Sequence, residues 1–140
     1  MKTLLDSCVL IYALERKDRL RDWARGLIAK AVAGEGAVAN TMALAELAVG
    51  AEDPGTVAAD VASWGVQLAD VPVAAAEPAA RAFRDYLEKR ASEPPTRRLP
   101  LPDFLIGAHA LVAGYRIATN DPDRFTVYFP DVPLELPAKG

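Results

Sequence analysis

Residues 2–15 have the sequence KTLLDSCVLIYALE, in which a short apolar run ends at Asp6 and a second apolar run follows with helical spacing. We predict a buried strand over residues 2–6 and a short helix over residues 7–15, with Ser7 as a candidate N-cap. Ligands of open parallel sheets bind beyond the carboxyl ends of the strands, so Asp6 stands where a functional residue is expected. It is equally well placed to cap the helix that follows, and position alone does not decide between these roles.

Short apolar runs and amphipathic helices continue to alternate along the chain, which is typical of α/β proteins. The predicted helices are 18–33, 41–49 (capped by Thr41), 53–64, 74–91 and 103–113, and the predicted strands are 37–39, 67–69, 116–119 and 126–129. Residues 92–102 hold four prolines and are expected to be a loop, because a periodic helix follows at once. We therefore predict one domain over residues 1–140, with a mainly parallel central sheet of about four to five strands flanked by helices.

The composition is that of an ordinary globular domain, with 140 residues, 51% hydrophobic and 25% charged, and a net charge of −3. Lys and Arg are absent from residues 31–80 and gather on both sides of this stretch. That distribution argues against a passive nucleic-acid coat but fits an enzyme with basic rims around an acidic centre. Because Asp6 interrupts the apolar N-terminus and no membrane-length run follows, we expect a cytoplasmic protein. The single cysteine, Cys8, is expected to be a buried, inert thiol.

Glu46 is the only charged residue of its predicted helix, and its neighbours one turn away are all apolar or small. They are Met42, Ala43, Val49 and Gly50. An ionised carboxylate on such a face is costly unless it is paired or bound to a cation. A solvent-facing glutamate on a short helix is the alternative, but the pattern favours a functional residue.

Two further acids stand at predicted element ends, where ordinary structural roles are also available. Asp103 begins a predicted helix and could be a plain N-cap, although small residues at Gly107 and Ala110 would let another chain or ligand approach that face. Asp121 follows a predicted strand and could belong to a simple Asp-Pro turn. His109 lies off the Asp103 face of the helix and is expected to be packed rather than to bind a ligand.

Taken together, the four acids predict a metal site. Mg²⁺ and Mn²⁺ prefer oxygen ligands, and carboxylates that different elements bring together repel one another unless a cation neutralises them. Such a cation activates water and offsets charge on a scissile phosphate. The sequence has no nucleophile-elbow, P-loop or dinucleotide-binding motif that would supply another chemistry.

Four motifs carry a resemblance to a known family. Leu4-Leu5-Asp6-Ser7-Cys8-Val9-Leu10-Ile11-Tyr12, Ala45-Glu46-Leu47-Ala48-Val49-Gly50, Pro102-Asp103-Phe104-Leu105-Ile106-Gly107-Ala108-His109-Ala110 and Ala118-Thr119-Asn120-Asp121 (with Phe125 beyond) occur in this order over nearly the whole chain. Each motif alone is weak, but the ordered set is similar to the acidic motifs of PIN domains. It resembles especially the VapC-type toxin ribonucleases of type II toxin–antitoxin pairs.

The resemblance implies a PIN-like parallel sheet and an Mg²⁺-dependent (or Mn²⁺-dependent) endoribonuclease that cleaves RNA. It also implies a homodimer and a cognate antitoxin that blocks the acidic site. It assigns Asp6, Glu46, Asp103 and Asp121 as catalytic metal ligands. Thr119 and Asn120 are implied as supporting residues, and Asp123 competes with Asp121 for the role of fourth acid.

Two other classes of function remain to be compared with this one. The main alternative is a non-catalytic PIN-like interaction module, against which the complete set of four acids argues. A receiver-type signalling domain would need paired acids after its first strand and a lysine after a late strand. Asp6 is instead followed by Ser7 and Cys8, and no lysine occurs between Lys89 and Lys139.

Overall fold

A single parallel sheet organises the computed structural model, which describes residues 1–15, 19–91 and 101–138. Its five strands are β1 (Thr3–Leu5), β2 (Ala37–Asn40), β3 (Gln67–Ala69), β4 (Arg116–Ala118) and β5 (Leu134–Glu135). They lie in the order β3-β2-β1-β4-β5, and every neighbouring pair is parallel. The predicted α/β fold with a parallel central sheet is confirmed.

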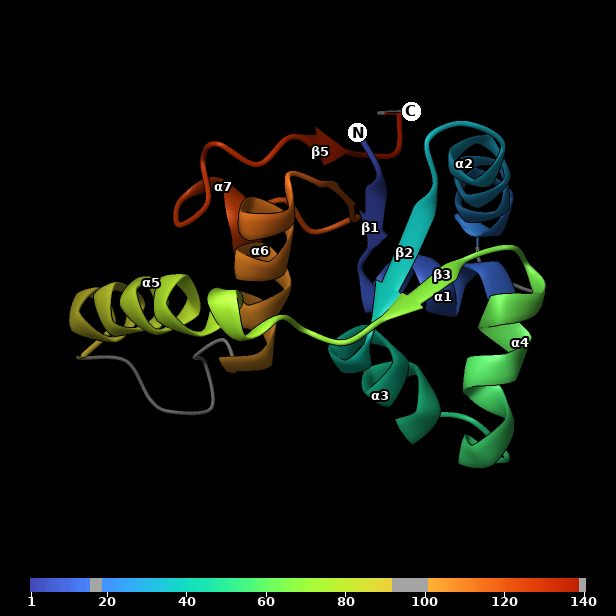
Figure 1. The fold of residues 1–140 in the computed structure, drawn as a ribbon, viewed down its shortest axis with the longest axis horizontal. Coiled ribbons are helices and arrows are strands. Elements are labelled where there is room, and N and C mark those ends of the chain that lie inside the picture. Colours follow the sequence, from blue (N-terminus) through green and yellow to red (C-terminus); the bar gives the residue numbers. More distant parts are fainter. Residues whose placement is uncertain (16–18, 92–100, 139–140) are drawn as a thin grey trace.

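Helices lie on both sides of the sheet (Figure 1). On one side are α1 (Ser7–Leu14), α2 (Arg21–Ala33), α3 (Thr41–Val49) and α4 (Val57–Ser63), and on the other are α5 (Ala76–Lys89), α6 (Leu101–Ala113) and α7 (Asp123–Thr126). Short 3₁₀ turns, Pro54–Thr56 and Val73–Ala75, precede α4 and α5. None of the helices in the described ranges combines the length and the apolar composition that a membrane crossing requires.

Alternation along the short strands explains why their sequences are apolar throughout. Leu5 and Ala39 enter the core under α1–α4, whereas Leu4, Val38 and Ile117 enter the core under α5–α7. All five side chains are fully buried. A parallel strand covered on both faces has no polar side, so these runs were recognisable as strands although they do not alternate in polarity.

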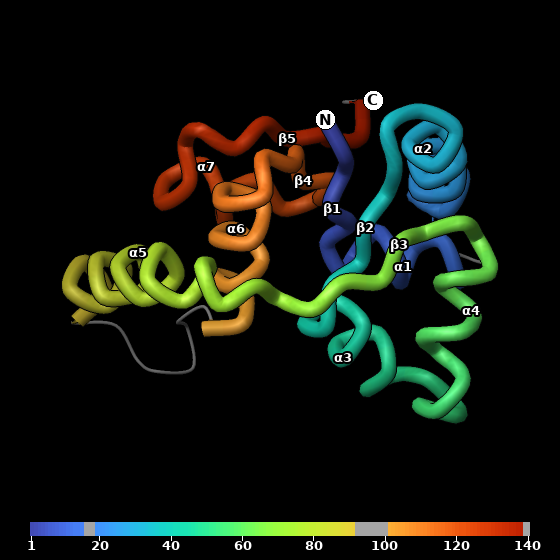
Figure 2. The backbone as a smooth tube through the Cα atoms, in the orientation of Figure 1, coloured from blue at the N-terminus to red at the C-terminus, as the bar shows by residue number. Residues whose placement is uncertain are grey.

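The chain order places a topological switch point beside β1. From β1 the chain proceeds outward to β2 and β3, and the segment after β3 then crosses to α5 on the other side of the molecule (Figure 2). It later returns to add β4 and β5 on the opposite side of β1. The carboxyl ends of β1 and β4 are therefore neighbours, and the Asp6 backbone N–H donates to the Ala118 carbonyl at 3.0 Å.

The predicted strand over residues 126–129 is wrong. This segment continues from α7, because the backbone N–H groups of Phe125 and Thr126 donate to the Pro122 carbonyl and that of Phe129 donates to the Phe125 carbonyl. Phe125 and Phe129, four residues apart, are both buried. The β-branched and aromatic residues suggested a strand, but their spacing is that of a helical turn. The last strand is instead Leu134–Glu135.

Three predicted helix starts also differ from the structure. The N-cap of α1 is Asp6 rather than Ser7, which is the first residue of the helix. The helix predicted to begin at Asp103 begins at Leu101, so Asp103 lies in the first turn and is not the N-cap. Pro102 is compatible with a first turn because no backbone N–H is needed there. The N-cap of α3 is Asn40 rather than Thr41, since its side chain accepts from the Ala43 N–H at 3.0 Å. Most of the predicted loop 92–102 lies outside the described residues.

Gly107 allows an aromatic ring to pack directly on α6. A Cβ atom at this position would overlap the ring of Phe129, which is itself buried. The small residues of α6 suggested room for a ligand or another chain. At Gly107 that space is filled by Phe129 from the chain's own C-terminal segment.

We predict that Gly107→Ala lowers the free energy of unfolding by about 1–3 kcal/mol, the usual cost of overpacking a core. Gly26 is the matched control, because it is also inside a helix but has no atom within 4 Å of the added Cβ. Gly26→Ala should stabilise the protein by about 0.5–1 kcal/mol, since alanine is the better helix former. Urea unfolding measures both, and equal effects of the two substitutions would contradict the packing argument.

Candidate functional site

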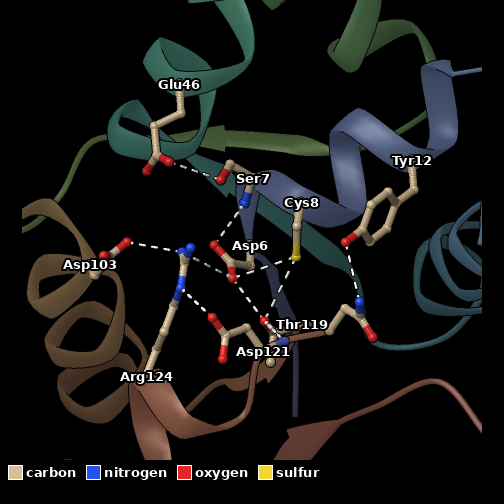
Figure 3. Close-up of polar contacts among 10 residues, drawn as sticks. Asp6, Ser7, Cys8, Tyr12, Glu46, Asp103, Thr119, Asp121 and Arg124 are labelled. Atoms are coloured by element: carbon tan, nitrogen blue, oxygen red, sulfur yellow. Dashed lines mark hydrogen bonds and ion pairs between the residues drawn. The ribbon is translucent and has the colours of Figure 1, made fainter. Parts of the chain in front are cut away.

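Asp6 is completely buried at the end of β1, and both of its carboxylate oxygens are hydrogen-bonded. Oδ1 accepts from the backbone N–H of Ser7 at 2.8 Å, and Oδ2 accepts from the Thr119 hydroxyl at 2.8 Å (Figure 3). Asp6 is thus the N-cap of α1 and also a carboxylate at the switch point. The two roles considered from the sequence are compatible, since they use different oxygens.

Thr119 links the two strand ends. It is fully buried, donates its hydroxyl proton to Asp6, and accepts from the Asp121 backbone N–H at 3.0 Å. Asn120, the other expected supporting residue, donates from Nδ2 to the Tyr12 hydroxyl at 3.2 Å. The structure therefore places Thr119 within the acidic cluster, whereas the Asn120 side chain contacts α1 beside it.

Glu46 approaches the cluster from α3. Its Oε2 accepts from the Ser7 hydroxyl at 3.1 Å, so Ser7 contacts both Asp6 and Glu46 (Figure 3). Its Oε1 is buried and has no hydrogen-bond partner among the described residues. Burying a carboxylate oxygen without a hydrogen-bond partner costs free energy. A ligand that bound this oxygen would therefore stabilise the site.

Arg124 lies among the other three acids, and the sequence analysis missed it. Its guanidinium Nη1 is 3.0 Å from Asp103 Oδ1 and 4.0 Å from Asp6 Oδ2, and its Nε is 2.9 Å from Asp121 Oδ2 (Figure 3). The side chain is 27% exposed. Asp121 and Arg124 are three residues apart, a spacing that would have indicated a pair if residues 123–126 had been recognised as helical.

The charges of the cluster act on one another. The pKa of Asp103 is raised from 3.8 to about 6, chiefly by burial; Arg124 opposes the shift, and the nearby carboxylates of Glu46, Asp6 and Asp121 add to it. Burial alone would lower the pKa of Arg124, but Asp103, Asp6 and Asp121 raise it above its ordinary value. The site gathers four carboxylates, and the single guanidinium of Arg124 offsets part of their negative charge.

The donor set fits a divalent cation, although the present arrangement is not a finished metal site. Four carboxylates offer hard oxygen ligands, and Glu46 Oε1 has no hydrogen-bond partner in the described part of the chain. Within residues 1–15, 19–91 and 101–138, no three His, Cys, Asp or Glu side chains are arranged to hold a metal ion as they stand. Arg124 engages three of the four acids in this arrangement.

The remaining candidates are also placed by the structure. Asp121 contacts Arg124, whereas Asp123 is an exposed residue at the start of α7, so Asp121 is the one that joins the cluster. His109 is buried, with its Nδ1 3.1 Å from Asn40 Nδ2, in agreement with a packed histidine. Burial and the charge of Asp6 raise the pKa of the half-buried Cys8 thiol to about 11, which disfavours a reactive thiolate.

The chain is similar to known proteins in its sequence pattern and in its fold. A family model described as the PIN domain matches residues 3–129. No curated protein gives a significant match. Among solved structures, the chain is similar to VapBC2 from Rickettsia felis bound to a DNA fragment from its promoter, with a TM-score of 0.71 and 19% identity over 99% of this chain and 100% of that chain.

Two further solved structures share the fold. VapBC-1 from nontypeable Haemophilus influenzae has a TM-score of 0.68 and 19% identity, covering 97% of this chain and 98% of that chain. VapC20 from Mycobacterium tuberculosis, described as a toxin that cleaves the sarcin-ricin loop, has a TM-score of 0.61 and 15% identity, covering 88% of this chain and 92% of that chain.

We predict that Asp103 makes the metal-free protein lose stability as the pH rises from about 4 to about 6. The folded pKa is raised from 3.8 to about 6, so in this window the native state keeps a proton that the unfolded chain has released. The free energy of unfolding therefore falls with rising pH, by on the order of 3 kcal/mol for this group. Asp103→Asn should remove that contribution in urea unfolding with EDTA present. A carboxyl pKa at or below 3.8 by NMR would show that Arg124 outweighs burial.

Proposed function

The chain belongs to the PIN domain family, and from that premise we propose that it is a metal-dependent endoribonuclease, the toxin of a toxin–antitoxin pair. The observation that carries this proposal is the convergence of Asp6, Glu46, Asp103 and Asp121 from separate segments on the switch point of the sheet. One carboxylate oxygen of Glu46 is buried there without a hydrogen-bond partner among the described residues. The likeness to a toxin described as cleaving the sarcin-ricin loop supports RNA as the substrate. Such a substrate places the activity in the cytoplasm.

We propose Mg²⁺ as the cofactor, with Mn²⁺ as a substitute, held by Asp6, Glu46, Asp103 and Asp121. When bound, such a cation lowers the pKa of a water molecule and offsets the charge that develops on the scissile phosphate. Asp6 and Asp103 are almost completely buried and form the fixed part of the ligand set. Asp121 is half exposed, with 51% of its side chain accessible, and stands on the solvent side where RNA would approach.

Neighbouring hydroxyl groups orient the ligands. The Thr119 hydroxyl donates to Asp6 Oδ2 and the Ser7 hydroxyl donates to Glu46 Oε2, so each of these carboxylates keeps one oxygen in a fixed direction. Residues that orient metal ligands in this way affect metal affinity although they do not touch the metal. Thr119 and Ser7 are therefore positioning residues.

A cognate antitoxin is the proposed protein partner. A groove of about 190 Å³ runs beside Glu46 and is lined by Ile11, Leu14, Leu47 and Ala51 together with Glu15 and Gly50. Ile11 and Leu14 are 37% and 45% exposed and both line this groove, so a partner that covered them would bury apolar surface. With Glu15 and Glu46 along it, the groove suits a segment that carries apolar side chains and an arginine. The likeness to VapBC toxin–antitoxin complexes supports this proposal.

A homodimer is also proposed, and sedimentation or light scattering of the purified chain tests it. The gene immediately upstream tests the antitoxin proposal at little cost. A small reading frame with a DNA-binding N-terminal part and an arginine-bearing tail is expected there.

The alternative function, a non-catalytic interaction module, has one observation in its favour. Arg124 engages three of the four acids, as it would if the site had become a structural ion-pair network. Isothermal titration with Mn²⁺ distinguishes the two functions, since a pure scaffold has no need of metal binding.

We predict that Asp6→Asn and Glu46→Gln each lower RNA cleavage in Mg²⁺ by at least about 100-fold, because each removes charge from the ligand set. Asp85→Asn is the matched control, since Asp85 is an exposed acid that pairs with Lys89 on α5. Circular dichroism should show all three variants folded. The proposed activity is wrong if folded wild-type protein, free of antitoxin, cleaves no RNA in Mg²⁺ or Mn²⁺.

We also predict that Thr119→Val weakens Mn²⁺ binding by about 10- to 100-fold, as loss of an orienting hydrogen bond does in other metal sites. Valine keeps the shape of threonine but cannot donate to Asp6. Thr119→Ser keeps the hydroxyl and should restore most of the affinity measured by calorimetry. Equal affinities for the valine and serine variants would show that the hydroxyl has no positioning role.

A further inference from the structure

Arg124 is the one basic side chain that contacts the acidic cluster in the part of the chain that the structure describes. Its donors point at Asp103 and Asp121 at hydrogen-bonding distance, and its charge lies 4.0 Å from Asp6. Asp6 and Asp103 are almost completely buried, so water screens their mutual repulsion poorly. In this state the guanidinium supplies the positive charge that such a group of carboxylates requires.

We propose that Arg124 is a built-in cation that holds the acidic site together without metal and that an incoming divalent metal must displace. This inference rests on the proposed metal site, and it adds that metal binding is an exchange of one cation for another. Arg124 thereby sets the metal affinity of the protein without being a metal ligand.

The contacts place Arg124 on carboxylates that the proposed metal site also requires. Arg124 binds Oδ1 of Asp103 and Oδ2 of Asp121, at 3.0 and 2.9 Å, through direct charge-assisted hydrogen bonds. A magnesium ion would need oxygens of the same carboxylates at about 2.1 Å. A doubly charged ion held by these carboxylates would repel the adjacent guanidinium strongly in this partly buried site, so the two cations compete for it.

The side chain of Arg124 is the part of the cluster that is able to move. It is 27% exposed and extends from α7, a helix of four residues, whereas Asp6 is fixed by two hydrogen bonds inside the core. Glu46 makes no ion pair with Arg124 and has its Oε1 free of hydrogen bonds within the described ranges. Glu46 would therefore be able to ligate a cation without loss of any Arg124 contact.

Calorimetric titration of the whole chain with Mn²⁺ alone tests the exchange. Arg124→Gln keeps much of the side-chain length but removes the charge, and it should bind Mn²⁺ at least roughly tenfold more tightly than wild type. Arg124→Lys, which keeps the charge but loses the forked geometry, should lie between the two. Arg81→Gln is the matched control, because Arg81 pairs with Glu77 on exposed α5 and should leave the affinity unchanged.

Thermal unfolding gives a second readout in the same proteins. Without metal, Arg124→Gln should unfold at a lower temperature than wild type, since it leaves buried carboxylates unpaired. Saturating Mn²⁺ should raise its unfolding temperature by more than that of wild type, because tighter binding gives the larger stabilisation.

NMR of the wild-type protein keeps the inference testable even if Arg124→Gln fails to fold. The Nε–Hε resonance of Arg124, identified by its absence from the Arg124→Lys spectrum, should shift during titration with Mg²⁺ and saturate with the binding isotherm. An unchanged resonance at full Mg²⁺ occupancy would overturn the exchange.

The outcomes separate this inference from the proposed function. If wild type and Arg124→Gln bind Mn²⁺ with equal affinity, the metal site stands and the role of Arg124 is wrong. If neither protein binds Mn²⁺, the proposed metal chemistry is wrong, and the exchange is wrong with it.

Discussion

Repulsion between buried carboxylates is the constraint on which the site depends. The parallel sheet brings the end of β1 beside the end of β4, and α3 and α6 add two more acids to the same region. A fold that concentrates negative charge in this way is stable only if each carboxylate is held and the whole is neutralised. Thr119, Ser7 and the α1 backbone hold the oxygens, and Arg124 balances the charge. The pKa of Asp103 is nevertheless raised, chiefly by burial and further by the neighbouring carboxylates.

The fold was predictable because the central strands are buried on both faces and therefore stand out as short apolar runs between amphipathic helices. Glu46 was predictable for a related reason, since a lone charge on an apolar helix face demands a partner. In the structure, Glu46 Oε2 accepts a hydrogen bond from Ser7, whereas Oε1 has no partner among the described residues. In both cases the pattern that supports the prediction lies within one short stretch of the sequence.

The features that could not be predicted depend on contacts between distant segments. Nothing in the sequence around Arg124 indicates that its side chain reaches Asp103, which is 21 positions earlier and on another helix. The segment after Asp121 was predicted as a strand because its residues have high β-propensity, and tertiary packing of Phe125 and Phe129 decided for a helical turn. The sequence could not decide whether Asp6 is a helix cap or a site residue because it is both. One carboxylate oxygen accepts from the α1 backbone and the other accepts from Thr119.

The contact of Phe129 with Gly107 matters for transferring this site to another protein scaffold. Asp103 and Gly107 are one turn apart on α6, so the ring that packs on Gly107 also fixes the rotation of the helix that presents Asp103. The same C-terminal segment carries Asp121 and Arg124. Helix α6 and residues 119–129 therefore position the acids together. If the four acids were grafted into another protein without Phe129, the orientation of Asp103 relative to the other three would be lost.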